Sequence, residues 1–83
     1  MPASIRVTQF PSIKASALLA VLSREPLGYS EVRRKGSHRV LRAAGRPDLR
    51  FSYHAGATVP PGVVRQYLIK FIGLDEDEAL RLL

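Results

Sequence analysis

Arg33-Arg34-Lys35-Gly36-Ser37-His38-Arg39 is the stretch of this chain that indicates both its fold and its chemistry. The residues on either side favour β-strands, and Gly36 permits a sharp turn because glycine reaches positive φ at little steric cost. The stretch therefore predicts a hairpin, with one strand over 29–34 and a second over 37–43. His38 lies just after the turn, and an imidazole can exchange a proton near neutral pH.

The hairpin carries four basic side chains around this histidine, so it should attract a polyanion. A proton-transfer group among phosphate-binding charges indicates a nucleic-acid binder or an enzyme that cuts nucleic acid. The plainer interpretation is a solvated basic face on which the histidine has no chemical role.

The charge of the whole chain supports an anionic partner. Thirteen Lys and Arg stand against seven Asp and Glu, and ten of the thirteen bases are arginines. Four of the acids are consecutive at 75–78, so residues 1–74 hold twelve bases and three acids, a net charge of +9. The planar guanidinium suits bidentate phosphate contacts.

The composition also excludes several classes of protein. The absence of cysteine excludes a disulfide scaffold and a thiolate zinc site, and two histidines without a matching carboxylate motif argue against a catalytic zinc site. We expect no metal and no cofactor. No apolar run approaches the roughly 18 residues that a membrane span needs, and residues 1–6 lack the apolar core of a secretory signal. We therefore expect no membrane association and a cytoplasmic protein.

Upstream of the hairpin, residues 13–24 form an expected helix, because apolar side chains recur at three- and four-residue spacing. Ser12 or Ser16 could cap its start, and Pro26 must lie beyond its end. Residues 1–11 are either a loose arm or an additional strand.

Downstream, residues 49–54 alternate as a half-buried strand does, with Leu49, Phe51 and Tyr53 on the core side. A connection over 55–60 leads to a second helix that opens at Pro60-Pro61-Gly62. Its expected buried stripe is Val64, Tyr67, Leu68, Phe71 and Ile72. Gly73 should end this helix.

A short last helix over 75–83 is predicted from the capping pattern in which Asp75 is followed by Glu78. The order of elements is then helix, three strands, helix and short helix. Consecutive strands joined by short turns predict an antiparallel three-stranded sheet, and helices on one face of it make a two-layer α+β fold. Eighty-three residues suggest a single domain over 1–83.

Three blocks of this sequence resemble the HicA family of bacterial toxins, over residues 14–74. The first block is the apolar helix that ends in Gly28-Tyr29, and the second is Arg34-Lys35-Gly36-Ser37-His38, which is similar to the family's Lys-Gly-Ser/Gly-His motif. The third runs from His54 through Pro60-Pro61-Gly62-Val63-Val64-Arg65 to Gly73-Leu74. Their order and spacing carry the resemblance.

The resemblance implies a fold like that of double-stranded-RNA-binding domains, α-β-β-β-α. It implies the toxin of a type II toxin–antitoxin system, an endoribonuclease (mRNA interferase) of the bacterial cytoplasm that cleaves messenger RNA. It also implies a HicB-type antitoxin as the protein partner, and it puts His38 at the family's catalytic position.

Cleavage of RNA without a metal needs a base for the 2′-hydroxyl, an acid for the leaving oxygen and positive charge at the phosphate. We expect His38 to be the acid–base group. The expected RNA contacts come from the hairpin and from the end of the third strand: Arg33, Arg34, Lys35, Ser37, Arg39 and His54. Two rivals remain open, an RNA-binding domain without catalysis and a basic module that docks an acidic protein.

Overall fold

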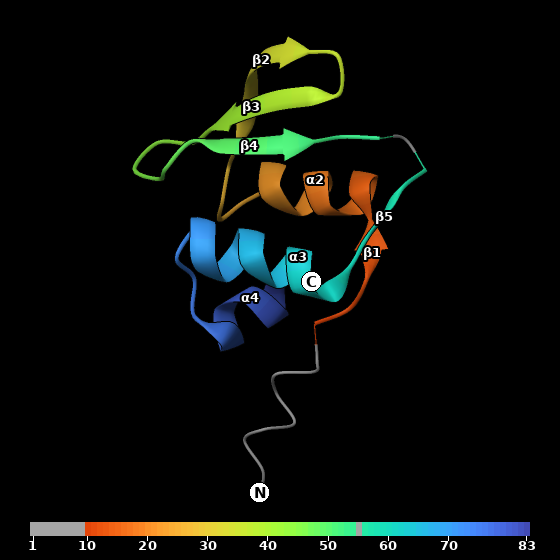
Figure 1. Ribbon diagram of the computed structural model, residues 1–83. Coiled ribbons are helices and arrows are strands. Elements are labelled where there is room, and N and C mark those ends of the chain that lie inside the picture. The colour runs from red at the N-terminus through yellow and green to blue at the C-terminus, as the bar shows by residue number, and fades with distance from the viewer. Residues whose placement is uncertain (1–9, 55) are drawn as a thin grey trace, which may run out of the picture.

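Three antiparallel strands lie over a layer of helices in the computed structural model, which describes residues 10–54 and 56–83 (Figure 1). In chain order the elements are β1 (Ile13–Lys14), α2 (Ala15–Ser23), β2 (Ser30–Lys35), β3 (His38–Arg42), β4 (Leu49–Ser52), β5 (Thr58–Val59), α3 (Pro61–Arg65), the π-helix η1 (Gln66–Phe71) and α4 (Glu76–Leu82). The predicted α+β class, the antiparallel three-stranded sheet and the three predicted helices are confirmed in this part of the chain.

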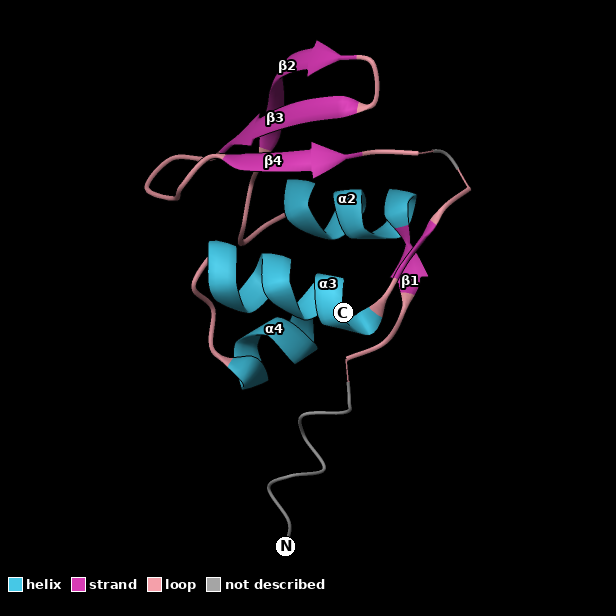
Figure 2. Ribbon diagram, in the orientation of Figure 1, coloured by secondary structure: helices cyan, strands magenta, loops and turns pink. Residues whose placement is uncertain are grey.

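The sheet has the order β2-β3-β4, so β3 is the central strand. Helices α2 and α3 cover one of its faces, with α4 beyond them, and none of the described helices lies over the other face (Figure 2). The covered face holds the buried side chains of Leu41, Leu49 and Phe51. The opposite face is the open face of the sheet.

Alternation along β4 follows the prediction. Leu49 and Phe51 are buried, whereas Arg50 and Ser52 between them are exposed. The strand is two residues shorter than expected and ends at Ser52. Burial of one face fixes this register, because a slip of one residue would expose every apolar side chain.

A second, two-stranded sheet was not predicted. Ile13 pairs with Val59 and Lys14 with Thr58, antiparallel, beside the start of α2. The helix expected over 13–24 therefore begins two residues late, and the connection over 55–60 contains a strand. The prediction failed because both strands are only two residues long, too short to show a period of two.

The start of α2 is not capped by serine as expected. Lys14 is the N-cap residue and provides no side-chain hydrogen bond. Instead the Ala15 amide donates to the Ala57 carbonyl at 2.9 Å, because β1 runs directly into the helix. The expected arm or strand over 1–11 lies mostly outside the described residues, but Phe10 is only 4% exposed and belongs to the core.

The second helix departs from its predicted stripe at its end. Val64, Leu68 and Ile72 are buried as expected, whereas Tyr67 is half-buried and Phe71 is 43% exposed. The reason is η1, in which a π-type turn closes with the Ile72 amide donating to the Tyr67 carbonyl at 3.1 Å. A π-type turn holds more residues than an α-turn, so side chains near its end leave the α-helical stripe.

The last helix, α4, begins where the capping pattern predicted. Gly73 has a φ of 92°, which suits a residue just past a helix end. The Asp75 carboxylate accepts a hydrogen bond from the Glu78 amide at 2.8 Å and caps α4.

Candidate nucleic-acid interface

His38 is the first residue of β3 and lies next to the hairpin turn. It pairs with Lys35 of β2 on one side and with Ser52 of β4 on the other. Directly opposed residues in a sheet project from the same face. Because Ser52 alternates with buried Phe51, His38 and Lys35 emerge on the open face of the sheet.

The turn that sets this pairing depends on Gly36. Its φ is 61°, in the left-handed region that other residues adopt at a cost. Ser37 completes the turn, and its carbonyl accepts a hydrogen bond from the Tyr53 amide at 2.8 Å. This bond ties the tip of the hairpin to the residue that follows β4.

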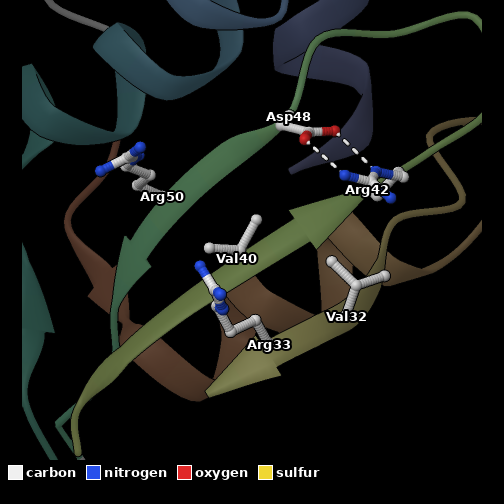
Figure 3. A pocket seen from close by; sticks show the side chains of 6 residues that line it. All are labelled: Val32, Arg33, Val40, Arg42, Asp48 and Arg50. Atoms are coloured by element: carbon white, nitrogen blue, oxygen red, sulfur yellow. Dashed lines mark hydrogen bonds and ion pairs between the residues drawn. The ribbon is translucent and has the colours of Figure 1, made fainter. Parts of the chain in front are cut away.

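A β-bulge in β2 changes which basic residues share the open face. Glu31 pairs with Leu41, and the next paired residue is Arg33, opposite Val40, so Val32 is an extra residue. Bulges commonly redirect side chains beside functional sites. Here Val32, Arg33 and Val40 rise together from the open face (Figure 3).

Two adjoining hollows lie on this face. The first, the His38 hollow, has a volume of about 250 Å³ and is lined by Arg33, Lys35, His38, Arg39, Val40 and Arg50. The second, the Asp48 hollow, has a volume of about 460 Å³ and is lined by Val32, Arg33, Val40, Arg42, Asp48 and Arg50 (Figure 3). Together they form a basic track along the sheet, with Val40 as its apolar floor.

The charges along the track are only partly balanced. Arg42 donates two hydrogen bonds to Asp48, at 3.1 and 3.0 Å, and this pairing holds the pKa of the Asp48 carboxyl below its ordinary value. Arg33, Lys35 and Arg50 have no acidic partner among the residues that the structure describes. Three cations without an acidic partner beside one imidazole have the chemistry that phosphate recognition uses.

Arg34 and Arg39, also predicted to bind RNA, project from the other face of the sheet, although Arg39 also contributes to the lining of the His38 hollow. They pair with each other across the hairpin and share the covered side of the sheet, since Arg39 is opposite Phe51. The Glu31 carboxylate accepts a hydrogen bond from Arg34 Nε at 3.0 Å and forms an ion pair with Arg39 Nη1 at 3.5 Å. The Arg39 guanidinium also stacks on Tyr53, 4.3 Å from the ring centroid, so it has a structural role there.

Two further predicted residues keep undecided roles. Ser37 is half-buried in the turn, and although it precedes His38 in the sequence it does not line the His38 hollow. His54 is exposed beyond the end of β4, and no hydrogen bond or ion pair joins it to His38 within residues 10–54 and 56–83. RNA contact by either one stays a prediction.

The structure adds residues that sequence reasoning missed, Arg50 and Arg42 above all. Alternation in 49–53 already put Arg50 on the face opposite Phe51. The sequence did not predict the register between β3 and β4. This register brings Arg50 opposite Val40 and into the lining of the His38 hollow. Register depends on packing and loop geometry more than on any local signal.

Across the described ranges, no three His, Cys, Asp or Glu side chains gather as metal ligands would. None of the described helices has the length and apolar character required to cross a bilayer.

Comparison with known proteins gives no matching family model, no matching curated protein and no matching solved structure.

Proposed function

We propose that this protein is an endoribonuclease that cuts messenger RNA with His38 as its acid–base residue. The observation that carries this proposal is the His38 hollow, where one imidazole shares a concave surface with Arg33, Lys35 and Arg50. A phosphodiester held by those cations brings its 2′-hydroxyl to the histidine.

The chemistry needs no group beyond the chain and the RNA. His38 takes the proton of the 2′-hydroxyl, and the 2′-oxygen forms a bond to phosphorus as the bond to the 5′-oxygen breaks. Arg33 and Arg50 stabilise the negative charge that grows on the phosphoryl oxygens. Lys35 lies opposite His38 in the pairing of β2 with β3. Its ammonium group donates a proton to the leaving oxygen. The products are a 2′,3′-cyclic phosphate and a 5′-hydroxyl.

The arrangement of elements supports the resemblance to the HicA family. A helix, three antiparallel strands and a second helix follow one another in the order implied for a fold like that of double-stranded-RNA-binding domains. We extend the proposal to a type II toxin of the bacterial cytoplasm. Its partner would be a HicB-type antitoxin that covers the open face and with it His38.

A second candidate is an RNA-binding domain without catalysis. It is favoured by one observation, that no described side chain makes a hydrogen bond or ion pair with the imidazole of His38. Histidines in general acid–base catalysis are commonly oriented by a partner group, so the RNA itself would have to orient this one.

Cleavage of a labelled RNA in EDTA decides between these candidates. We expect cleavage by the wild type, and a His38→Ala variant slower by at least the 10²–10⁴-fold that general acid–base catalysis typically supplies. RNA binding should survive, since the basic side chains remain. His54→Ala is the comparison variant, because it removes the other histidine, which is also exposed but lies outside the His38 hollow.

Each result has a plain meaning once circular dichroism and a thermal melt show that the variants are folded. A His38→Ala protein within about tenfold of wild type, short of that range, removes His38 from the mechanism and turns attention to His54. Binding by the wild type without cleavage supports the second candidate. No RNA binding at all would indicate a basic protein-interaction module.

A further inference from the structure

Phe71 is a large apolar side chain that the fold leaves in solvent. Its place in the sequence favours the core, yet the π-type turn of η1 carries it to the edge and leaves it 43% exposed. π-type turns are rare, and they occur frequently at functional sites. A ring exposed by such a turn is therefore a candidate contact for a ligand.

The ring of Phe71 is held in position by Tyr67. The two rings meet edge to face, with centroids 5.6 Å apart and an interplanar angle of 78°. Tyr67 is fixed in turn, because its hydroxyl donates to the Arg50 carbonyl at 3.1 Å and its ring packs on Phe51 at 5.4 Å. An aromatic surface that is already oriented loses little entropy when a flat ligand stacks on it.

A third hollow opens beside this ring. The Phe71 hollow has a volume of about 430 Å³ and is lined by Pro47, Asp48, Leu49, Arg50, Lys70 and Phe71. Its far wall is also fixed, since the Pro47 carbonyl accepts a hydrogen bond from the buried Tyr29 hydroxyl at 2.7 Å. The hollow thus joins an oriented ring to the basic residues Arg50 and Lys70.

Arg50 links all three hollows. It lines the His38 hollow, the Asp48 hollow and the Phe71 hollow, and the last two also share Asp48. The negative charge of Asp48 is compensated by Arg42, while Lys70 has no acidic partner among the described residues. A basic track therefore runs from His38 across the sheet and around β4 to Phe71.

We propose that Phe71 is a stacking platform for an unpaired nucleobase of the RNA whose backbone crosses the open face. This inference rests on the proposed function and assigns the substrate class, single-stranded RNA. Aromatic side chains bind splayed bases of single strands, whereas the bases of a duplex stay stacked on each other. Lys70 and Arg50 contact the phosphates that flank the stacked base.

The inference is tested with RNA that cannot be cut. An oligonucleotide methylated at every 2′-oxygen lacks the nucleophile, so affinity is measured with His38 intact. Phe71→Ala should weaken binding by about 5- to 150-fold, which corresponds to the roughly 1–3 kcal/mol of a stacked base. Phe71→Leu, which keeps apolar bulk but loses the ring, should weaken it similarly, and Phe71→Tyr should restore it.

A fluorescence measurement reports stacking directly. The chain contains no tryptophan, so Phe71→Trp introduces a single tryptophan on the platform, whose emission can be excited apart from that of the three tyrosines. We expect its emission to be quenched as RNA is added, and more by a single strand than by a duplex of the same sequence. Leu83→Trp is the control, since Leu83 is also exposed but lies at the far end of α4.

The outcomes separate the two proposals. If wild type binds and cuts RNA while Phe71→Leu binds unchanged and Phe71→Trp is not quenched, the platform is wrong and the ribonuclease stands. If wild type binds no RNA, both fall. If the Phe71 variants bind RNA normally but lose a co-expressed protein partner, the surface is a protein interface and the inference is overturned.

Discussion

Lys35 and His38 face each other as the pair of the β2–β3 ladder nearest to the turn, with only Gly36 and Ser37 between them. The turn therefore decides where the imidazole lies relative to the nearest cation of the hairpin. The strand pairing puts both side chains on the open face of the sheet. The described helices all lie on the other side of the sheet (Figure 2). A site of this kind depends on a turn of correct geometry more than on any single contact.

Replacing Gly36 by alanine tests this dependence. The φ of 61° is strained for any residue with a Cβ, although an added Cβ would meet nothing within 4 Å. We expect the free energy of unfolding to fall by about 1–2 kcal/mol from backbone strain alone. Gly62→Ala in α3 is the matched control, since its backbone is helical and its surroundings are also empty. Urea melts of both variants decide, and equal stability would contradict the argument.

The hairpin shows how far the sequence could predict this fold. The turn at Gly36 and the buried side of β4 follow from local chemistry, since glycine permits positive φ and Leu49 and Phe51 alternate with polar residues. The bulge at Val32 has no such local signal. It reverses the side on which the following residues project, so the sequence could not tell that Arg33 joins His38 while Arg34 lies across the sheet.

The helical half shows the same limit. A three-four spacing predicted Val64, Leu68 and Ile72 in the core, but it also put Phe71 there. Periodicity assumes a uniform helix, and a π-type turn breaks that assumption without a distinctive residue. The exposed ring, and with it the third hollow, therefore became visible only in three dimensions.

Asp48→Asn should strengthen RNA binding. The Asp48 carboxylate accepts two hydrogen bonds from Arg42, and the lowered pKa of Asp48 keeps this carboxylate ionised at neutral pH. Removing that charge frees Arg42 for a phosphate on the open face. We expect tighter binding and a log–log salt slope steeper by about 0.7, the value for one more contact to a single strand.

Glu25→Gln is the control for Asp48→Asn, because it makes the same change in net charge in the loop before β2, away from the three hollows. Salt titrations of both variants against the same RNA separate the local effect from the global one. If the two variants gain affinity equally, net charge explains the change and Arg42 is not a phosphate ligand.

Tyr29→Phe should lower stability and flatten its loss at high pH. Burial raises the pKa of the Tyr29 hydroxyl, so the folded state holds the proton more tightly than the unfolded state does. The resulting stabilisation is present below about pH 10 and is lost as pH rises through the folded-state pKa. The variant also loses the hydrogen bond to Pro47, worth about 0.5–1.5 kcal/mol.

Denaturant melts from pH 7 to pH 11 measure both effects. Tyr53→Phe is the control, because its hydroxyl has no hydrogen-bond partner in the described part of the chain and its ring still lies under Arg39. An alkaline decline in Tyr29→Phe as steep as in wild type would show that Tyr29 does not contribute to it.

The two faces of the hairpin should contribute unequally to RNA binding, and neighbouring arginines can show it. Arg33 and Arg50 line the His38 hollow without an acidic partner, whereas Arg34 is bound to Glu31 on the other side of the sheet. Each phosphate contact that is lost should reduce the log–log salt slope by about 0.7 for a single strand. We therefore expect Arg33→Gln and Arg50→Gln each to flatten the slope by about that amount, and Arg34→Gln to leave it nearly unchanged.

The three variants change net charge identically, so charge alone predicts equal effects. If Arg34→Gln flattens the slope as much as Arg33→Gln does, RNA wraps around the hairpin, and the open face is not the whole binding surface.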